Sequence, residues 1–239
     1  SVKPMSVVSI GRLIIVGTIH VQKSSVENVK RIISETKPST VAVELCEDRY
    51  YLLKTRVETS PMPTFRFGVI PWLLAVLERT AGEKTGVFPG AEMVEAAAAG
   101  VRLGAKIEFV DMPIQQIIQR IRSIPFREKS RLVLDSILAL ITILVGVKVE
   151  KNIPESPDKL VLKFKNRYPN LHRCLVEERN RYIVQRLASI LASTAGTIVA
   201  VVGLGHLNDL AKELSTVKPP EPYYSVSLKW SIQRFECST

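Results

Sequence analysis

Two short segments near opposite ends of the sequence share the pattern V-G-x-x-H. The first, VGTIH, covers Val16–His20, and the second, VGLGH, covers Val202–His206. The chain has only three histidines, and this pattern contains two of them. Each copy follows a short apolar run rich in β-branched residues, which is typical of a buried strand. Two strands of one sheet would bring both imidazoles to the same edge.

Two carboxylates also lie at the ends of expected strands. Glu44 is the penultimate residue of VAVEL, and Asp111 ends IEFVD. Ligands of open parallel sheets bind outside the carboxyl ends of the strands. We therefore expect one functional cleft that is lined by His20, Glu44, Asp111 and His206.

These residue types allow two chemistries. Two histidines and one carboxylate with open positions can ligate zinc, manganese or iron, and a bound ion activates water and polarises a carbonyl group. Without a metal, a histidine oriented by Glu44 can act as a general base for direct attack by water. The residues alone leave both open. The sequence contains no H-E-x-x-H, G-x-S-x-G or Walker lysine motif, which disfavours three common hydrolase classes.

A polar tripeptide, Glu178-Arg179-Asn180, lies within a predicted helix. The planar fork of an arginine donates two parallel hydrogen bonds, so Arg179 suits a carboxylate or a developing oxyanion. The alternative is that the tripeptide is a polar patch on a helix surface.

Hydrophobic periodicity predicts the elements that must position these side chains. Strand, helix and strand follow one another within roughly 30 residues at the N-terminal end, which is typical of a parallel βαβ unit. We predict an α/β fold with a mostly parallel central sheet flanked by helices. The block from about 113 to 192 has no convincing strand and is predicted to be a large helical insertion. Strands are predicted over 13–17, 39–45, 105–111, 196–203 and 223–235, and helices over 24–37, 46–57, 70–80, 90–104, 113–123, 132–149, 170–191 and 206–215.

Charge is concentrated in the predicted insertion. The net charge is +10, and residues 120–186 contain 15 Lys/Arg against 7 Asp/Glu. Such a surface suits an anionic membrane or a nucleic acid, although a solvated helical face is the simpler interpretation. Nucleic acid is not expected, because the chain has no zinc finger, RNA-recognition signature or interleaved aromatic and basic residues.

The segment from Leu132 to Val149 is strongly apolar. We predict a buried or partner-contacting helix, which could support a homodimer; a membrane-inserted helix is the alternative. The three cysteines form no C-x-x-C pair, so neither a disulfide framework nor a cysteine zinc site is indicated. This favours a reducing compartment, and we expect the cytoplasm or the cytoplasmic surface of the membrane.

Six segments, taken in order, resemble the TraB/PrgY family, which shares a superfamily with the Tiki and GumN proteins. They are GTIHVQKSSVENVKRII, VAVELCEDRY, GAEMVEAAAAG, GAKIEFVDMPI, VEERNRYIV and VVGLGH. The resemblance runs from about residue 11 to 206. It implies a fold of the erythromycin-esterase/ChaN type in one TraB-type domain over residues 1–239.

The resemblance also implies an activity, because Tiki relatives are metal-dependent peptidases and PrgY-type relatives act against peptide pheromones. His20, Glu44 and His206 would be catalytic and would ligate Mn, Co or Zn, and Arg179 would be the cation of the site. Residues expected to bind substrate or support the site are Arg49, Glu92, Asp111 and Asn180. We expect a metallopeptidase-like hydrolase of small or extended peptides. The alternatives are a non-catalytic peptide- or lipid-binding regulatory module at a membrane, and, by fold analogy, a metal-free esterase.

Overall fold

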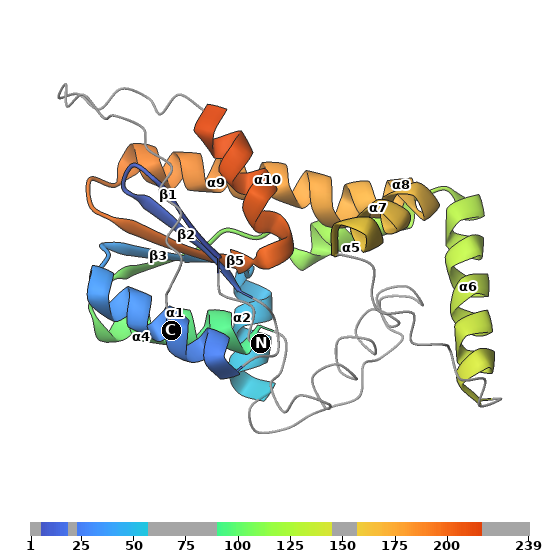
Figure 1. Ribbon diagram of the computed structural model, residues 1–239, viewed down its shortest axis with the longest axis horizontal. Helices are drawn as coiled ribbons and strands as arrows, with labels where there is room; N and C mark the ends of the chain where they lie inside the picture. The colour runs from blue at the N-terminus through green and yellow to red at the C-terminus, as the bar shows by residue number, and fades with distance from the viewer. Residues whose placement is uncertain (1–5, 19–22, 57–89, 145–156, 217–239) are drawn as a thin grey trace.

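The structure is a computed structural model, and it describes residues 6–18, 23–56, 90–144 and 157–216. These ranges form one sheet with helices on both faces (Figure 1). The strands are β1 (Ser6–Ile10), β2 (Leu13–Thr18), β3 (Thr40–Val43), β4 (Lys106–Phe109) and β5 (Ile198–Gly203). The helices are α1 (Lys23–Thr36), α2 (Glu47–Arg56), α4 (Ala91–Arg102), α5 (Ile114–Ser123), α6 (Phe126–Leu144), α7 (Pro157–Arg167), α8 (Pro169–His172), the π-helical segment η2 (Arg173–Glu177), α9 (Glu178–Ser193) and α10 (Leu204–Thr216).

The sheet has the strand order β1-β2-β5-β3-β4. Four strands are parallel, and β1 pairs antiparallel with β2 at one edge. The predicted α/β class with a mostly parallel sheet is therefore confirmed. Because β2 and β5 are direct neighbours, with Thr18 opposite Gly203, the two V-G-x-x-H motifs begin on adjacent strands.

Helices bury both faces of the sheet, which explains why the inner strands are continuous apolar runs rather than alternating ones. Helices α9 and α10 cover the face formed by Leu13, Ile15 and Ala200. Helices α1 and α4 cover the opposite face, which includes Val16 and Val201. Figure 1 shows these two helix layers above and below the strands.

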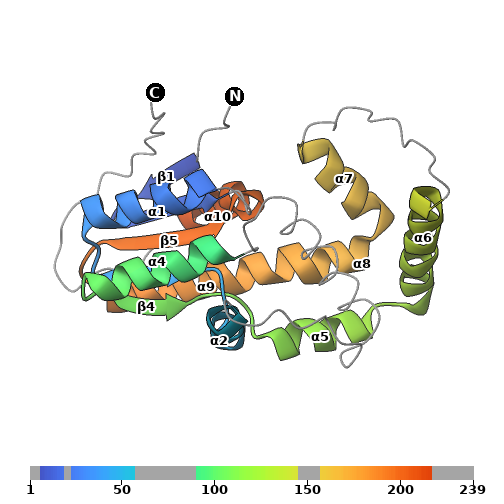
Figure 2. The same cartoon turned by 90° about the horizontal axis from the view of Figure 1, so that it is seen from below.

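Within the described part of residues 113–192, the regular elements are all helices joined by short connections. A small separate core packs α5 against α8 and η2, and its buried residues are Ile121, Ile124, Tyr168, Leu171 and Cys174. Helix α9 then returns to the sheet, where Ile183 and Leu187 are fully buried. Helix α6 stands apart from the sheet in both views (Figures 1 and 2).

Several elements differ from the sequence prediction. Strand β1 was not predicted, although the residues Gly11 and Arg12 separate two β-branched runs and Gly11 has a φ of 57°, as a tight hairpin requires. The predicted helix over 170–191 is divided into α8, η2 and α9. The predicted helix over 70–80, the predicted strand over 223–235 and the last residues of the apolar run (145–149) lie outside the described residues.

The apolar run that could have entered a membrane is described only as far as the end of α6. Among the described residues, no helix combines the length and the apolar content that crossing a bilayer requires.

Candidate functional site

Glu44 is held rigidly where β3 ends. Its backbone N–H donates to Val201 O at 3.0 Å, so the residue extends the pairing of β3 with β5 by one step. Its Oε2 accepts a hydrogen bond of 2.7 Å from the backbone N–H of Gly203. The residue is only 5% exposed. The glycine of the second V-G-x-x-H motif therefore binds the predicted strand-end carboxylate directly.

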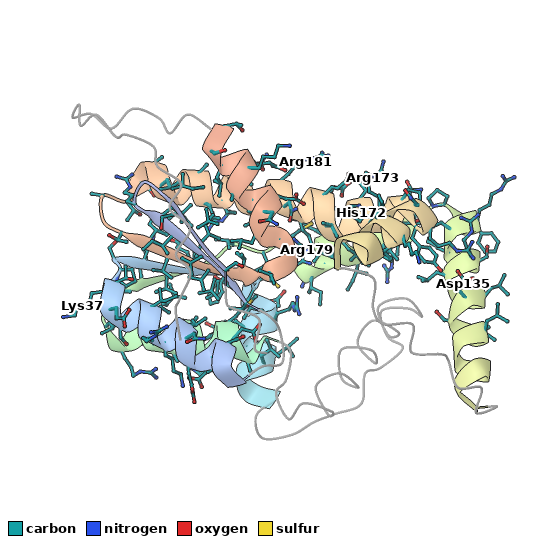
Figure 3. The ribbon with its side chains drawn as sticks, viewed as in Figure 1. Lys37, Asp135, His172, Arg173, Arg179 and Arg181 are labelled. Atoms are coloured by element: carbon teal, nitrogen blue, oxygen red, sulfur yellow. The ribbon has the colours of Figure 1, made fainter. Side chains whose placement is uncertain are left out.

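Arg179 connects Glu44 with a second carboxylate. Its Nη2 donates to Glu44 Oε1 at 2.8 Å and to Asp111 Oδ2 at 2.9 Å, and its Nε donates to Asp111 Oδ1 at 2.9 Å. A third nitrogen, Nη1, donates to Leu175 O at 3.2 Å. The guanidinium thus clamps two carboxylates that follow neighbouring parallel strands, β3 and β4. Figure 3 labels Arg179 on α9, close to α10.

His206 lies in the first turn of α10, with its two ring nitrogens facing different partners. Nε2 is 3.3 Å from Glu44 Oε1, and Nδ1 is 2.5 Å from Asn180 Oδ1. The amide nitrogen of Asn180 donates to Asp209 Oδ2 at 3.3 Å. Because that bond uses the NH₂ group, the amide oxygen is the atom that faces His206, and Nδ1 must carry the proton.

This arrangement has a consequence for Nε2. With the proton on Nδ1, a neutral His206 points a lone pair from Nε2 toward a carboxylate oxygen. Two electron-rich atoms at this distance are stabilised by a cation between them. That cation is either a second proton, which makes an imidazolium–carboxylate pair, or a metal ion.

The distance between these two atoms also fits a metal. Ligands at about 2.1 Å from a tetrahedral divalent ion are about 3.4 Å apart, and Nε2 and Oε1 are separated by 3.3 Å. A ligand histidine normally has its other ring nitrogen bound to an oxygen acceptor, as Asn180 provides here. In the part of the chain that the structure describes, no group of three or more His, Cys, Asp or Glu side chains could hold a metal. His206 and Glu44 thus offer two donor atoms at a spacing that fits one ion, and a mononuclear site would need a third ligand.

The other predicted residues lie at the same edge of the sheet or outside the described ranges. Arg49, on α2, has its Nη1 3.8 Å from Asp111 Oδ2, an ion pair that is too long for a hydrogen bond. Glu92 is 1% exposed in the first turn of α4. This helix runs back toward the start of β4, so its N-terminus faces the carboxyl ends of the strands. His20 lies outside the described residues.

Two features of the site were not predicted. Asp209, which fixes the Asn180 amide, lies three residues after His206 and hence on the same face of α10, a spacing that the sequence does contain. The π-helical segment η2 ends immediately before the Glu178-Arg179-Asn180 tripeptide. An inserted π turn rotates everything that follows it, and such turns are frequent at functional sites.

Gly17 shows how the first motif supports the second. A Cβ on Gly17 would lie 2.9 Å from Leu207 Cδ2 and 3.1 Å from Leu204 Cδ1. Both leucines belong to α10, and Leu207 is 1% exposed. The missing side chain thus lets α10 approach β2 closely, and His206 is carried on that helix.

Comparison with known proteins gives a family model and several relatives that match most of the chain. A sequence model of the TraB/PrgY/gumN family matches residues 7–214, which include Glu44, Arg179 and His206. Uncharacterized protein MJ1365 of Methanocaldococcus jannaschii is 29% identical over 213 residues, covering 85% of this chain and 53% of that protein. A TraB domain-containing protein of Homo sapiens is 27% identical over 251 aligned residues, covering 87% of this chain and 66% of that protein. The chain thus spans between half and two thirds of the length of these relatives.

Proposed function

Because the chain belongs to the TraB/PrgY/gumN family, we propose that it is a divalent-metal-dependent hydrolase that cleaves small or extended peptides. One observation carries the proposal: the buried Glu44 carboxylate faces a histidine nitrogen whose lone pair is directed by Asn180. His206 and Glu44 would hold a Mn, Co or Zn ion, with His20 as the third ligand. The remaining coordination positions would accept water and substrate.

Each protein group at the site has a separate task in this proposal. A bound ion would lower the pKa of a water molecule and polarise the peptide carbonyl. Asn180 and Asp209 keep Nε2 of His206 directed at Glu44. Gly203 and Arg179 hold the Glu44 carboxylate from two sides, so that it needs little reorganisation on binding.

Arg179 acts mainly by positioning. Its bonds to Glu44 and Asp111 use the guanidinium fork that an oxyanion would otherwise occupy. We therefore assign its positive charge to the two carboxylates. Asp111 in turn keeps the arginine in place, and Arg49 contributes a second, more distant positive charge.

A metal-free reaction is the second candidate, and the same pair of atoms favours it. A proton between His206 Nε2 and Glu44 Oε1 satisfies both atoms. A neutral His206 could act as a general base by taking this proton on Nε2 from an attacking water, and Glu44 would stabilise the imidazolium that forms. Activity that survives complete chelation would favour this candidate.

The test combines metal content with cleavage. The purified chain is analysed for bound metal and incubated with a peptide library, with Mn, Co or Zn added and again after chelation. We expect His20→Ala, Glu44→Gln and His206→Ala to lose both metal and cleavage. His172→Ala is the matched control, because this buried histidine lies beside Glu177 in the helical region. No cleavage under any of the three metals by a protein that also binds none of them would refute the proposal, and metal binding without cleavage would favour a binding module.

A further inference from the structure

Helix α6 exposes large apolar side chains. Phe126 is 81% exposed, Leu134 is 59%, Ile137 is 48% and Leu138 is 61%. The surfaces of soluble proteins routinely carry single exposed apolar residues, but a contiguous group of them marks a contact surface. Asp135, on the same helix, lies well away from Arg179 of the candidate site (Figure 3). This group therefore serves something other than the chemistry at Glu44.

The apolar group shares its helix face with arginines. Arg127, Arg131, Leu134 and Leu138 are spaced by four, three and four residues, so they form one stripe along α6. Together with Ile137 and Arg167, they line an open hollow of about 380 Å³. We call these six residues the α6 face.

The acidic residues around the α6 face are occupied by internal partners. Asp135 accepts hydrogen bonds from Tyr168 and Arg167, and these bonds hold the pKa of its carboxyl below the ordinary value. Glu128 is buried and accepts from the backbone and side chain of Asn170. Arg131 donates a hydrogen bond of 3.3 Å to an uncharged acceptor, the carbonyl oxygen of Arg167, and its charge also contributes to the lowered pKa of Asp135. Residues 126–138 and 162–177 contain seven Lys/Arg and three Asp/Glu, so positive charge prevails.

From this combination we propose that the α6 face docks onto an anionic lipid bilayer. Aliphatic side chains that enter the boundary between headgroups and acyl chains, with arginines at the phosphates, are the usual pattern of interfacial helices. The helix would lie on the membrane, in keeping with the finding that no described helix is apolar and long enough to cross one.

Charge and shape argue against two other occupants. A second copy of this chain would bring two arginine-rich surfaces together, and like charges repel. A nucleic acid offers phosphates but no apolar layer that could cover Leu134, Ile137 and Leu138. An anionic bilayer offers an apolar layer for the leucines and isoleucine of the α6 face and phosphates for its arginines.

The test is co-sedimentation of the full chain with vesicles of phosphatidylcholine, with and without phosphatidylglycerol. We expect binding only to vesicles with phosphatidylglycerol, and weaker binding at high salt. Arg127→Gln and Arg131→Gln should each weaken binding about fivefold. Leu134→Ser with Leu138→Ser should weaken vesicle binding about tenfold or more. The ratio of the affinities of the unaltered chain and this variant should change little with salt, because the lost contact is apolar.

Matched controls and opposing outcomes are available in the same chain. Arg102→Gln with Leu103→Ser changes an exposed cation and an exposed leucine at the end of α4, on the sheet region, and should leave vesicle binding unchanged. Equal binding to both vesicle types, or equal binding by the leucine variants, would overturn the proposal. Light scattering and thermal unfolding of the leucine variant then decide what covers the α6 face. If the unaltered chain is a dimer and the variant is a monomer, a second copy covers it. If the variant has a lower Tm and unaltered vesicle binding, a segment of this chain covers it.

Discussion

Replacing Arg179 by methionine tests whether its guanidinium holds the site together. The Glu44 side chain is 4% exposed and that of Asp111 is 0% exposed, while Arg179 itself is 14% exposed. Removing one partner of a buried ion pair costs about 3–5 kcal/mol, because the remaining charge is left uncompensated. Methionine fills much of the space of the arginine side chain but carries no charge, so the packing around residue 179 changes little.

The structure places the expected loss at the lower end of that range. Glu44 keeps the hydrogen bond from the Gly203 backbone, and Asp111 keeps one of 2.8 Å from the backbone N–H of Met112. We expect the free energy of unfolding to fall by about 3 kcal/mol at neutral pH. For a chain of this size that corresponds to a Tm lower by about 6–12 °C.

Denaturant unfolding of both proteins at neutral pH provides the assay. Arg186→Met is the control on the same helix: Arg186 pairs with Glu108 at 3.1 Å, with side chains 42% and 16% exposed, and exposed pairs contribute at most about 1 kcal/mol. A loss no larger than that of Arg186→Met would refute the clamp.

Three further predictions concern other contacts in the structure. Asn180→Leu removes the acceptor for His206 Nδ1 and should weaken zinc binding about 10- to 100-fold in a competition titration; equal affinity of the leucine variant would contradict the proposed orientation. Gly17→Ala forces a Cβ against a buried leucine of α10 and should lower the free energy of unfolding by about 1–3 kcal/mol in urea; a neutral result would contradict the tight contact between β2 and α10. Asp135→Asn should destabilise the chain at neutral pH. The pKa of Asp135 is lowered first by the hydrogen bond from the neighbouring tyrosine and then by that from the arginine. Its contribution is therefore present above the unfolded pKa and is lost as the pH falls through the lower folded pKa, and a difference that persists unchanged in strong acid would oppose this assignment.

Local pattern was sufficient to predict most elements of the sheet. The runs LIIV and IVAVV, each followed by glycine, became β2 and β5, and the helical spacing of Val29 and Ile33 became the buried side of α1. These signals are local, because burial on two faces selects β-branched runs and burial on one face selects helical spacing. Strand β1 escaped prediction, although a glycine-containing two-residue turn joins it to β2.

Part of the site could be predicted for the same reason. Glu44, Asp111 and His206 were placed correctly at the carboxyl edge of the sheet, since the ends of parallel strands share an edge. Their partners could be predicted only in part: the sequence suggested a carboxylate for Arg179 and Glu44 for a histidine, but no role for Asp209. That Asn180 binds His206, and that Asp209 fixes Asn180, depends on how α9 packs against α10.

By itself the sequence determined which chemical groups are present and which of them end a strand or lie on a helix, because those properties depend on neighbours a few positions away. Only the tertiary structure decided that β5 lies between β2 and β3, and hence that Gly203 reaches Glu44. The same holds for the bond between Arg179 and Glu44, which are 135 positions apart. Contacts between residues so far apart in the sequence follow from strand order and helix packing, to which the whole core contributes.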